Sequence, residues 1–110
     1  MKREHFDHFF IAGFAYYEGV LAFEQLKIGS LLSMKLEADN RHDKRAIEIY
    51  FDAFKLGYVP RSNNKAVYAI LKSGCDILEA RVQTKSPDMP PEQQIQVVLF
   101  SKVREDSVDV

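Results

Sequence analysis

The sequence predicts a mostly β domain with one short helix, built as a small barrel or curled sheet of about six or seven strands. Several short segments are rich in β-branched and aromatic residues and alternate between apolar and polar positions, whereas one segment has apolar residues at helical spacing. The 110 residues are 46% hydrophobic and 28% charged, which is typical of a globular domain that buries a core. Short antiparallel strands favour a closed barrel, because closure removes exposed sheet edges.

The first half of the chain contains four predicted strands. Residues 6–17 are aromatic and partly alternating, and residues 31–37 place apolar side chains at alternate positions. Residues 46–51 also alternate, and residues 55–59 follow them after a tight connection. These last two segments are therefore expected to form a β-hairpin.

The pattern changes to a helical period after Pro60. Ser62 or Asn63 can cap the N-terminus of a helix, and Ser73-Gly74 is a typical C-terminal signal. The apolar residues that recur at helical spacing between these signals are Ala66, Val67, Ile70 and Leu71. Together these residues predict one short helix.

Two further β-rich segments, residues 77–83 and 94–103, flank a loop at residues 86–91. Three prolines in this loop remove backbone donors and fix φ, so the loop does not continue a strand. The flanking segments are expected to pair as antiparallel strands.

We expect one domain over residues 1–110, with a core at about residues 6–103 and flexible tails at residues 1–5 and 104–110. No apolar segment approaches the ~20 residues that span a bilayer, and the N-terminus does not resemble a secretory signal. The single cysteine, Cys75, cannot form an internal disulfide and is expected to be a small buried hydrophobe. These features predict a cytoplasmic protein with no membrane contact.

The charge of the chain argues against a strongly basic nucleic-acid binder. Fifteen lysines and arginines nearly balance sixteen acidic residues, and the formal net charge is -1. Residues 41–65 are locally basic, with six basic and three acidic side chains. Such a patch can contact a few phosphates, but long non-specific duplex binding needs many more. Mixed charge is also the normal state of a solvated surface.

No segment carries a recognisable catalytic, phosphate-binding or metal-binding motif. The sequence lacks a Gly-x-Ser-x-Gly elbow and a Gly-x-x-x-x-Gly-Lys-Ser/Thr loop. Its three histidines have no helical His-x-x-x-His spacing and no partnering cysteine pair, and residues 39–43 lack the ligand pattern of an EF-hand. We therefore expect no cofactor, no metal site and no enzymatic activity.

The polar connection at residues 37–47 is the most informative segment. It brings Asn40, His42, Asp43 and Lys44 together between two predicted strands. An asparagine amide can form a two-point hydrogen bond with a base, an imidazole can stack on a base, and a lysine can meet a phosphate. The alternative is a structural role, because Asn and Asp side chains commonly stabilise turns through nearby backbone amides.

Four segments, in their order and spacing, resemble a HIRAN domain. They are residues 11–19, 26–32, 37–47 and 55–61, and they contain a carboxylate-x-x-Asn-x-x-Asp-x-x-Ala-Ile element and a Gly-Tyr-Val-Pro element. The resemblance extends over about residues 9–83. HIRAN domains occur at the N-terminus of SWI/SNF-type helicases and as stand-alone bacterial proteins, and this chain resembles the stand-alone type.

The resemblance implies a modified OB-like β-barrel, within the class of small OB-like and SH3-like barrels. From the helicase members it implies binding of single-stranded DNA at a free 3′-hydroxyl end, in DNA repair or replication-fork processing. A helicase or nuclease is the partner expected if the chain is instead a protein-interaction module. Zinc and hydrolase terms attached to the family belong to the RING and helicase parts of the longer proteins. The resemblance therefore implies neither zinc nor hydrolase activity for this chain.

The resemblance assigns roles to six residues, and our hypothesis adds Arg61 as a seventh. Tyr16 and His42 stack on bases, Asn40 reads a base edge, Asp43 accepts a hydrogen bond from the 3′-hydroxyl, and Lys44, Tyr58 and Arg61 lie near phosphate. One departure weakens the expected affinity, because Ala15 stands where the DNA-end binders carry a phosphate-binding arginine. Losing a charge-assisted contact of roughly 1.5 to 3 kcal/mol lowers affinity about ten- to a hundredfold.

Other interpretations of the same residues stay open. Tyr16 and Tyr58 can be aromatic residues of the core or of the barrel rim, and Asp43 can be only the cap of its loop. The chain can instead be a protein-interaction module that docks its partner through a strand edge or through the helix at residues 63–71. The oligomeric state is not predicted.

Overall fold

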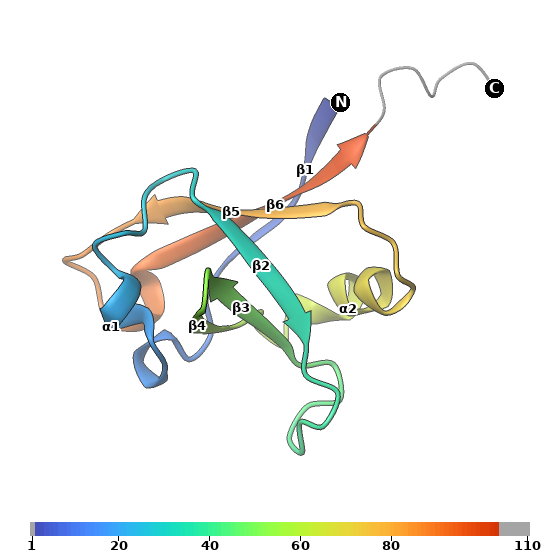
Figure 1. Ribbon diagram of the computed structural model, residues 1–110, viewed down its shortest axis with the longest axis horizontal. Coiled ribbons are helices and arrows are strands. Elements are labelled where there is room, and N and C mark those ends of the chain that lie inside the picture. Colours follow the sequence, from blue (N-terminus) through green and yellow to red (C-terminus); the bar gives the residue numbers. More distant parts are fainter. Residues whose placement is uncertain (1, 104–110) are drawn as a thin grey trace.

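The computed structural model describes residues 2–103, which form a mostly β structure (Figure 1). The strands are β1 (Lys2–Phe10), β2 (Leu31–Leu36), β3 (Ile47–Phe51), β4 (Phe54–Tyr58), β5 (Leu78–Lys85) and β6 (Ile95–Val103). The helices are α1 (Gly19–Ala22) and α2 (Asn64–Lys72), and the 3-10 turns are η1 (Phe14–Tyr16) and η2 (Pro91–Gln93). The predicted fold class is confirmed.

The strands form one antiparallel sheet that curls until its two edges meet. Their order is β1-β6-β5-β2-β3-β4, and in Figure 1 β2 crosses between the layer of β1, β6 and β5 and the β3–β4 hairpin below it. Ala12, just after β1, exchanges two backbone hydrogen bonds of 2.9 Å with Tyr58 at the end of β4. This bridge closes the sheet into a small OB-like barrel.

The closure depends on a glycine in β4. Gly57 has a φ of 147°, a backbone conformation that L side chains rarely adopt. A Cβ at this position would collide with the carbonyl oxygen of Ala12 and with the side chain of Ile11. Glycine is therefore required where the chain after β1 approaches β4.

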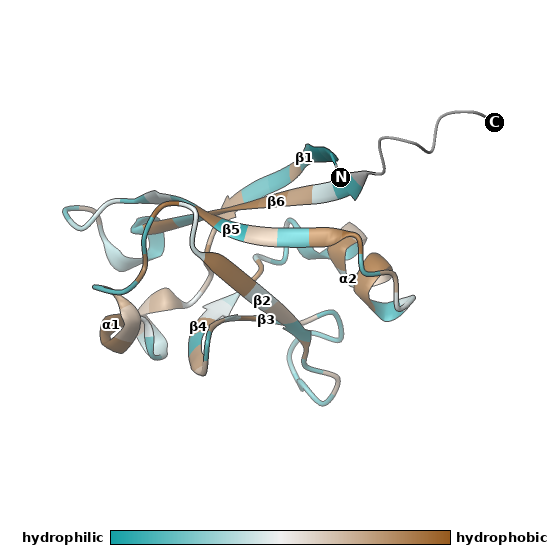
Figure 2. Cartoon of the chain, turned by 45° about the horizontal axis from the view of Figure 1, so that its top comes forward, coloured by the Kyte–Doolittle hydropathy of each residue, from teal (hydrophilic) through white to brown (hydrophobic). Residues whose placement is uncertain are grey.

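The hydrophobic core fills the interior of the barrel. Its fully buried apolar side chains include Ile11, Leu26, Ile47, Ile49, Leu56, Val67, Val82, Ile95, Val97 and Leu99. Figure 2 shows that β2 is largely hydrophobic, whereas the loop that follows it is hydrophilic. The packed strands β2 and β3 therefore anchor both ends of the polar loop at residues 37–46.

The predicted hairpin and the predicted helix are both confirmed. β3 pairs with β4, and Asp52 makes the turn between them with a φ of 51°. α2 ends at Lys72 with Ser73 as its C-cap, and the following Gly74 has a φ of 81°. Asn63 stands at the N-cap position as predicted, but its side chain donates a hydrogen bond to Asp7 of β1 and makes no capping hydrogen bond to the helix backbone.

The predicted strand at residues 6–17 is wrong after Phe10. Gly13 has a φ of 74° and turns the chain into η1, so Tyr16 lies on a turn and not on a strand. Phe14 is buried and Tyr16 is exposed, so the alternation of aromatic residues imitates a strand pattern. Alternation alone does not distinguish these two conformations.

Two expectations about the ends of the chain and its cysteine also need correction. Residues 2–5 are not a tail, because β1 begins at Lys2 and pairs with β6 as far as Val103. The tail predicted at residues 104–110 lies outside the described residues. Cys75 is exposed and not buried, because it lies in the connection between α2 and β5.

Candidate functional site

An open pocket of about 320 Å³ lies beside the barrel closure, between η1 and the loop at residues 37–46. Its lining residues are Ala12, Gly13, Tyr16, Tyr17, Asn40, His42, Asp43, Ala46, Tyr58, Val59 and Arg61. The structure thus brings six of the seven predicted site residues together, and Lys44 is the exception.

Tyr16 stands at the lip of the pocket with its ring in solvent. The residue is 85% exposed, and its backbone N–H donates to the carbonyl of Gly13 at 2.9 Å. Tyr16 is therefore not a core residue, and its ring can stack on a ligand. The neighbouring Tyr17 is 39% exposed and packs edge-to-face against Tyr58, with ring centroids 5.7 Å apart.

Asn40 organises the loop from inside. Its Oδ1 accepts hydrogen bonds from the backbone N–H groups of His42 and Asp43, both at 2.8 Å. Its Nδ2 donates to Glu37 Oε1 at 2.6 Å. Both acceptor positions of the amide oxygen are thus in use. At most one Nδ2 hydrogen is left for a base, so a two-point base contact requires the loop to rearrange.

Asp43 connects the same loop to α2 while it borders the pocket. Its Oδ1 accepts from the backbone N–H of Arg45 at 2.9 Å, and its Oδ2 accepts from Nδ2 of the buried Asn64 at 2.9 Å. Arg61 Nε lies 3.8 Å from Oδ2, and the Asp43 side chain is 19% exposed. A carboxylate has about four acceptor positions, so Asp43 can stabilise the loop and still accept from a ligand hydroxyl.

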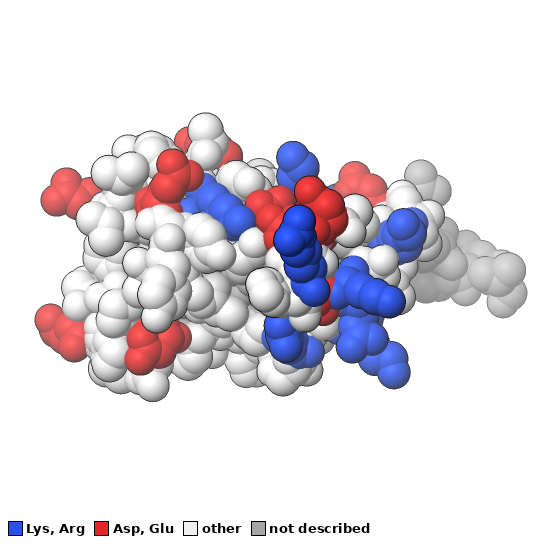
Figure 3. Space-filling model, turned by 90° about the horizontal axis from the view of Figure 1, so that it is seen from below, with Lys and Arg blue, Asp and Glu red and all other residues white. Residues whose placement is uncertain are grey.

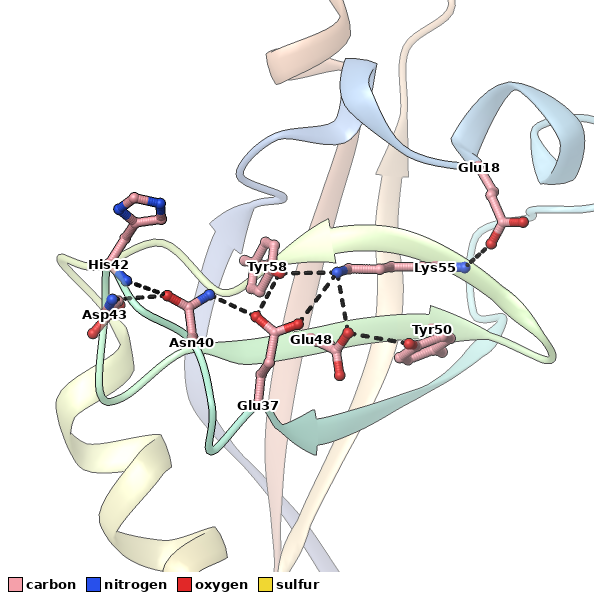
Figure 4. A network of polar contacts seen from close by, with 9 residues as sticks. All are labelled: Glu18, Glu37, Asn40, His42, Asp43, Glu48, Tyr50, Lys55 and Tyr58. Carbon is pink, nitrogen blue, oxygen red and sulfur yellow. Dashed lines mark hydrogen bonds and ion pairs between the residues drawn. The ribbon is translucent and has the colours of Figure 1, made fainter.

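His42 and Arg61 present polar groups on the loop side of the pocket. The imidazole of His42 points away from the polar network behind the pocket (Figure 4). Arg61 donates to the carbonyl oxygen of His42 at 3.0 Å, and its side chain is 71% exposed. The guanidinium group of Arg61 is therefore held by one hydrogen bond and is still accessible to an anionic ligand.

Basic side chains gather on one part of the lower face, next to a broad uncharged area (Figure 3). The exposed basic residues of the loop, of the segment leading into α2 and of the first turn of α2 are Arg41, Lys44, Arg45, Arg61 and Lys65. Lys44 belongs to this group, although it does not line the pocket. These cations can meet phosphates that lie outside the pocket.

A polar network that the sequence did not predict lies behind the pocket (Figure 4). Lys55 Nζ is 2.8 Å from Tyr58 Oη and 3.0 Å from Glu48 Oε2, and it lies 4.4 Å and 4.5 Å from the ring centroids of Tyr17 and Tyr58. Tyr58 Oη donates to Glu37 Oε1 at 2.7 Å. Because this hydrogen is already donated, Tyr58 offers the pocket its ring and no hydroxyl donor for phosphate.

The network determines the charge states of its members. Hydrogen bonds from Asn40 and Tyr58 lower the pKa of Glu37, so this carboxylate is ionised at neutral pH. Burial alone would lower the pKa of Lys55, but its hydrogen bonds to Tyr58 and Glu48 outweigh burial and raise the pKa. Burial, opposed by Lys55 and reinforced by the hydrogen bond to Glu37, raises the pKa of Tyr58 to about 12. Lys55 is thus charged and Tyr58 neutral.

Within residues 2–103 the structure contains neither a metal-binding cluster nor a membrane-spanning helix. No group of three or more His, Cys, Asp or Glu side chains in this range is arranged to hold a metal ion, so the ligand set of a structural zinc site is not present there. Among the described helices, none is long and apolar enough to cross a membrane. The cytoplasmic location stays a prediction.

The fold and the pocket define a small OB-like binding domain with an exposed aromatic residue and a basic loop beside an open pocket. The chain belongs to the HIRAN domain family, because the family model matches residues 7–103. HIRAN domains are known as nucleic-acid-binding modules. The resemblance found in the sequence is thus confirmed.

Two solved structures share this fold. A protein from Lactobacillus plantarum has a TM-score of 0.77 and 22% sequence identity, over 91% of this chain and 95% of that chain. The HIRAN domain of human HLTF has a TM-score of 0.61 and 16% identity, over 91% of this chain and 76% of that chain. At these identities the likeness establishes the fold. No curated protein matches the chain.

Proposed function

We propose that this chain is a non-catalytic module that takes the 3′-hydroxyl end of single-stranded DNA into its pocket. The observation that carries the proposal is the exposed ring of Tyr16 at the lip of a pocket whose other side is formed by His42, Asp43 and Arg61. Aromatic rings, a carboxylate and a cation in one open pocket match the base, the terminal hydroxyl and the phosphate of a nucleotide.

Each ligand-facing group has a distinct task in this proposal. Tyr16 and His42 stack on bases, and Asp43 accepts the hydrogen of the 3′-hydroxyl. Arg61 meets the nearest phosphate, and Lys44 meets a phosphate farther along the strand. Asn40 and Tyr58 act mainly by holding the loop and the floor of the pocket, because their hydrogen-bonding groups are engaged inside the protein.

The expected affinity is modest. Stacking contributes about 1 to 3 kcal/mol per base, so contacts to two or three bases support micromolar binding. Ala15 is exposed at the position where the helicase members carry an arginine, so it supplies no charge-assisted contact. Arg61 is the cation that lines the pocket and is exposed. Because only Arg61 and Lys44 are assigned to phosphates, binding is expected to weaken less steeply with salt than that of a protein with many phosphate contacts.

Fluorescence anisotropy at low salt tests the proposal with a 5′-labelled single strand of about ten nucleotides, ending in either a 3′-hydroxyl or a 3′-phosphate. We expect tighter binding of the hydroxyl end. Tyr16→Ala is expected to weaken binding about five- to a hundredfold, the equivalent of one lost stacking contact. The control is Ile28→Ala, because Ile28 is 72% exposed and does not line the pocket. Equal loss in both variants would contradict the role of Tyr16.

Asp43→Ala is expected to reduce the preference for the hydroxyl end. Because Asp43 also holds the loop to Asn64, the control is Asn64→Ala, which loosens the same contact and keeps the carboxylate. The control is expected to lower affinity for both ends by the same factor. If Asp43→Ala keeps the wild-type preference, another group recognises the hydroxyl.

A second candidate function is docking of a protein such as a helicase or nuclease. Val20 and Leu21 of α1 are 82% and 65% exposed, close in sequence to Tyr16. α2 does not offer such a face, because Val67 is fully buried and Tyr68 packs against the core. Failure of the chain to bind either DNA end would favour docking through α1.

A further inference from the structure

The pocket is backed by the negative charge of two carboxylates, Glu37 at the start of the loop motif and Glu48 of β3. Glu37 and Glu48 share one cation, since Lys55 Nζ lies 3.6 Å from Glu37 Oε2 and 3.0 Å from Glu48 Oε2. The two carboxylate side chains are 23% and 10% exposed, so water screens them only partly. With two carboxylates on one ammonium group, one negative charge behind the pocket is not compensated.

Asp43 forms an ion pair of one carboxylate with one cation, whereas Glu37 and Glu48 share a single cation. Its carboxylate receives hydrogen bonds from the Arg45 backbone and from Asn64, and Arg61 faces it at 3.8 Å. Glu18 adds a further carboxylate next to the network, because its Oε1 accepts from the backbone N–H of Lys55 at 2.9 Å. The excess negative charge therefore belongs to the pair of Glu37 and Glu48, which share Lys55, and Glu37 is the member that accepts hydrogen bonds from the lining residues Asn40 and Tyr58.

Glu37 reaches the pocket through two lining residues. Its Oε1 accepts from Tyr58 Oη at 2.7 Å and from Asn40 Nδ2 at 2.6 Å, and both of these residues line the pocket. Glu37 itself is not a lining residue. It can therefore influence a ligand through its charge and through the position of its two partners, without direct contact.

We propose that Glu37 is a specificity-determining residue whose charge disfavours a terminal phosphate and so selects an uncharged nucleic-acid end. The inference rests on the proposed function and deepens it, because it adds to the hydroxyl contact of Asp43 a second source of discrimination, the charge of Glu37 behind the pocket. The exposed basic residues outside the pocket attract internal phosphates, whereas the negatively charged floor repels a terminal one. A strand is therefore expected to bind in one orientation, with its uncharged end in the pocket and its internal phosphates near the basic residues outside it.

The test compares the ratio of dissociation constants for 3′-phosphate and 3′-hydroxyl strands, measured by fluorescence anisotropy at low salt. Glu37→Gln keeps an acceptor oxygen for Tyr58 and Asn40 and removes the charge, so we expect the ratio to fall about three- to tenfold. Lys55→Gln removes the shared cation, so we expect the ratio to rise. A purely structural effect would shift both variants in the same direction.

The control is Glu24→Gln, which removes an exposed carboxylate that does not line the pocket. This control is expected to leave the ratio unchanged. An unchanged ratio in Glu37→Gln, while the wild type prefers the hydroxyl end, overturns this inference and leaves the proposed function standing. A wild-type protein that binds neither strand overturns the proposed function, and the inference falls with it.

Discussion

Replacing Gly57 by alanine tests whether the contact between Ala12 and β4 stabilises the barrel. The left-handed φ of 147° is unfavourable for alanine by about 1 to 3 kcal/mol. The new Cβ also meets the carbonyl oxygen of Ala12, and such overpacking costs about 1 to 3 kcal/mol. Backbone atoms can relieve the collision only by stretching the two 2.9 Å hydrogen bonds to Tyr58. We therefore expect a loss of about 3 to 5 kcal/mol in the free energy of unfolding.

Urea denaturation followed by circular dichroism measures this loss, and thermal unfolding should show a midpoint lower by roughly 12 to 30 °C. The matched control is Gly74→Ala. Gly74 has a φ of 81°, but no atom lies within 4 Å of its Cβ position, so only backbone strain of about 1 kcal/mol is expected there. If Gly57→Ala is no less stable than Gly74→Ala, the barrel closure does not contribute as we describe.

Three further predictions concern the network and the pocket. Lys55→Met leaves the 8% exposed Glu48 without its cation. We therefore expect urea denaturation to show a free energy of unfolding lower by about 2 to 4 kcal/mol. A decrease below about 0.5 kcal/mol would contradict this role of Lys55. The pKa of Glu37 is lower in the folded protein than in the unfolded chain. Ionised Glu37 therefore adds to the free energy of unfolding at a pH above the pKa of the unfolded chain, and this contribution is lost as the pH falls through the pKa of the folded protein. Glu37→Gln should therefore lose less stability than the wild type between about pH 5 and pH 3, and parallel losses in thermal unfolding would refute the assignment. Tyr16→Ala should change the free energy of unfolding by no more than about 0.5 kcal/mol, since Tyr16 is 85% exposed, and a larger loss would show a structural role.

The hairpin, α2 and the β5–β6 pair were predictable because their signals are local. A strand or a helix appears in the sequence as a period of two or of 3.6 residues, and turn residues mark its ends. The turn after β1 was not predictable in the same way. Its aromatic residues alternate like those of a strand, and the reversal depends on the single left-handed conformation at Gly13.

The network behind the pocket could not be predicted because its members come from different strands. Glu37 follows β2, Glu48 lies on β3 and Lys55 lies on β4. Each is an ordinary polar position in an alternating segment. Only the register, in which Glu48 is opposite Tyr58 and Lys35, brings the carboxylates and the ammonium group together. Register depends on tertiary packing, which a single sequence does not show.

The loop motif combines folding and binding tasks, and the structure separates them. The amide oxygen of Asn40 accepts hydrogen bonds from two backbone N–H groups of the loop. Asp43 connects the loop to α2 by accepting a hydrogen bond from Asn64 at the start of that helix. These residue types would be needed at these positions even if the pocket held no ligand, because they accept hydrogen bonds from backbone N–H groups of the loop and from the buried Asn64. Tyr16 and Arg61 are different, since they are 85% and 71% exposed and so bury little surface on folding. Variants at these two exposed positions therefore report on binding most directly, and variants at the loop residues require a stability control.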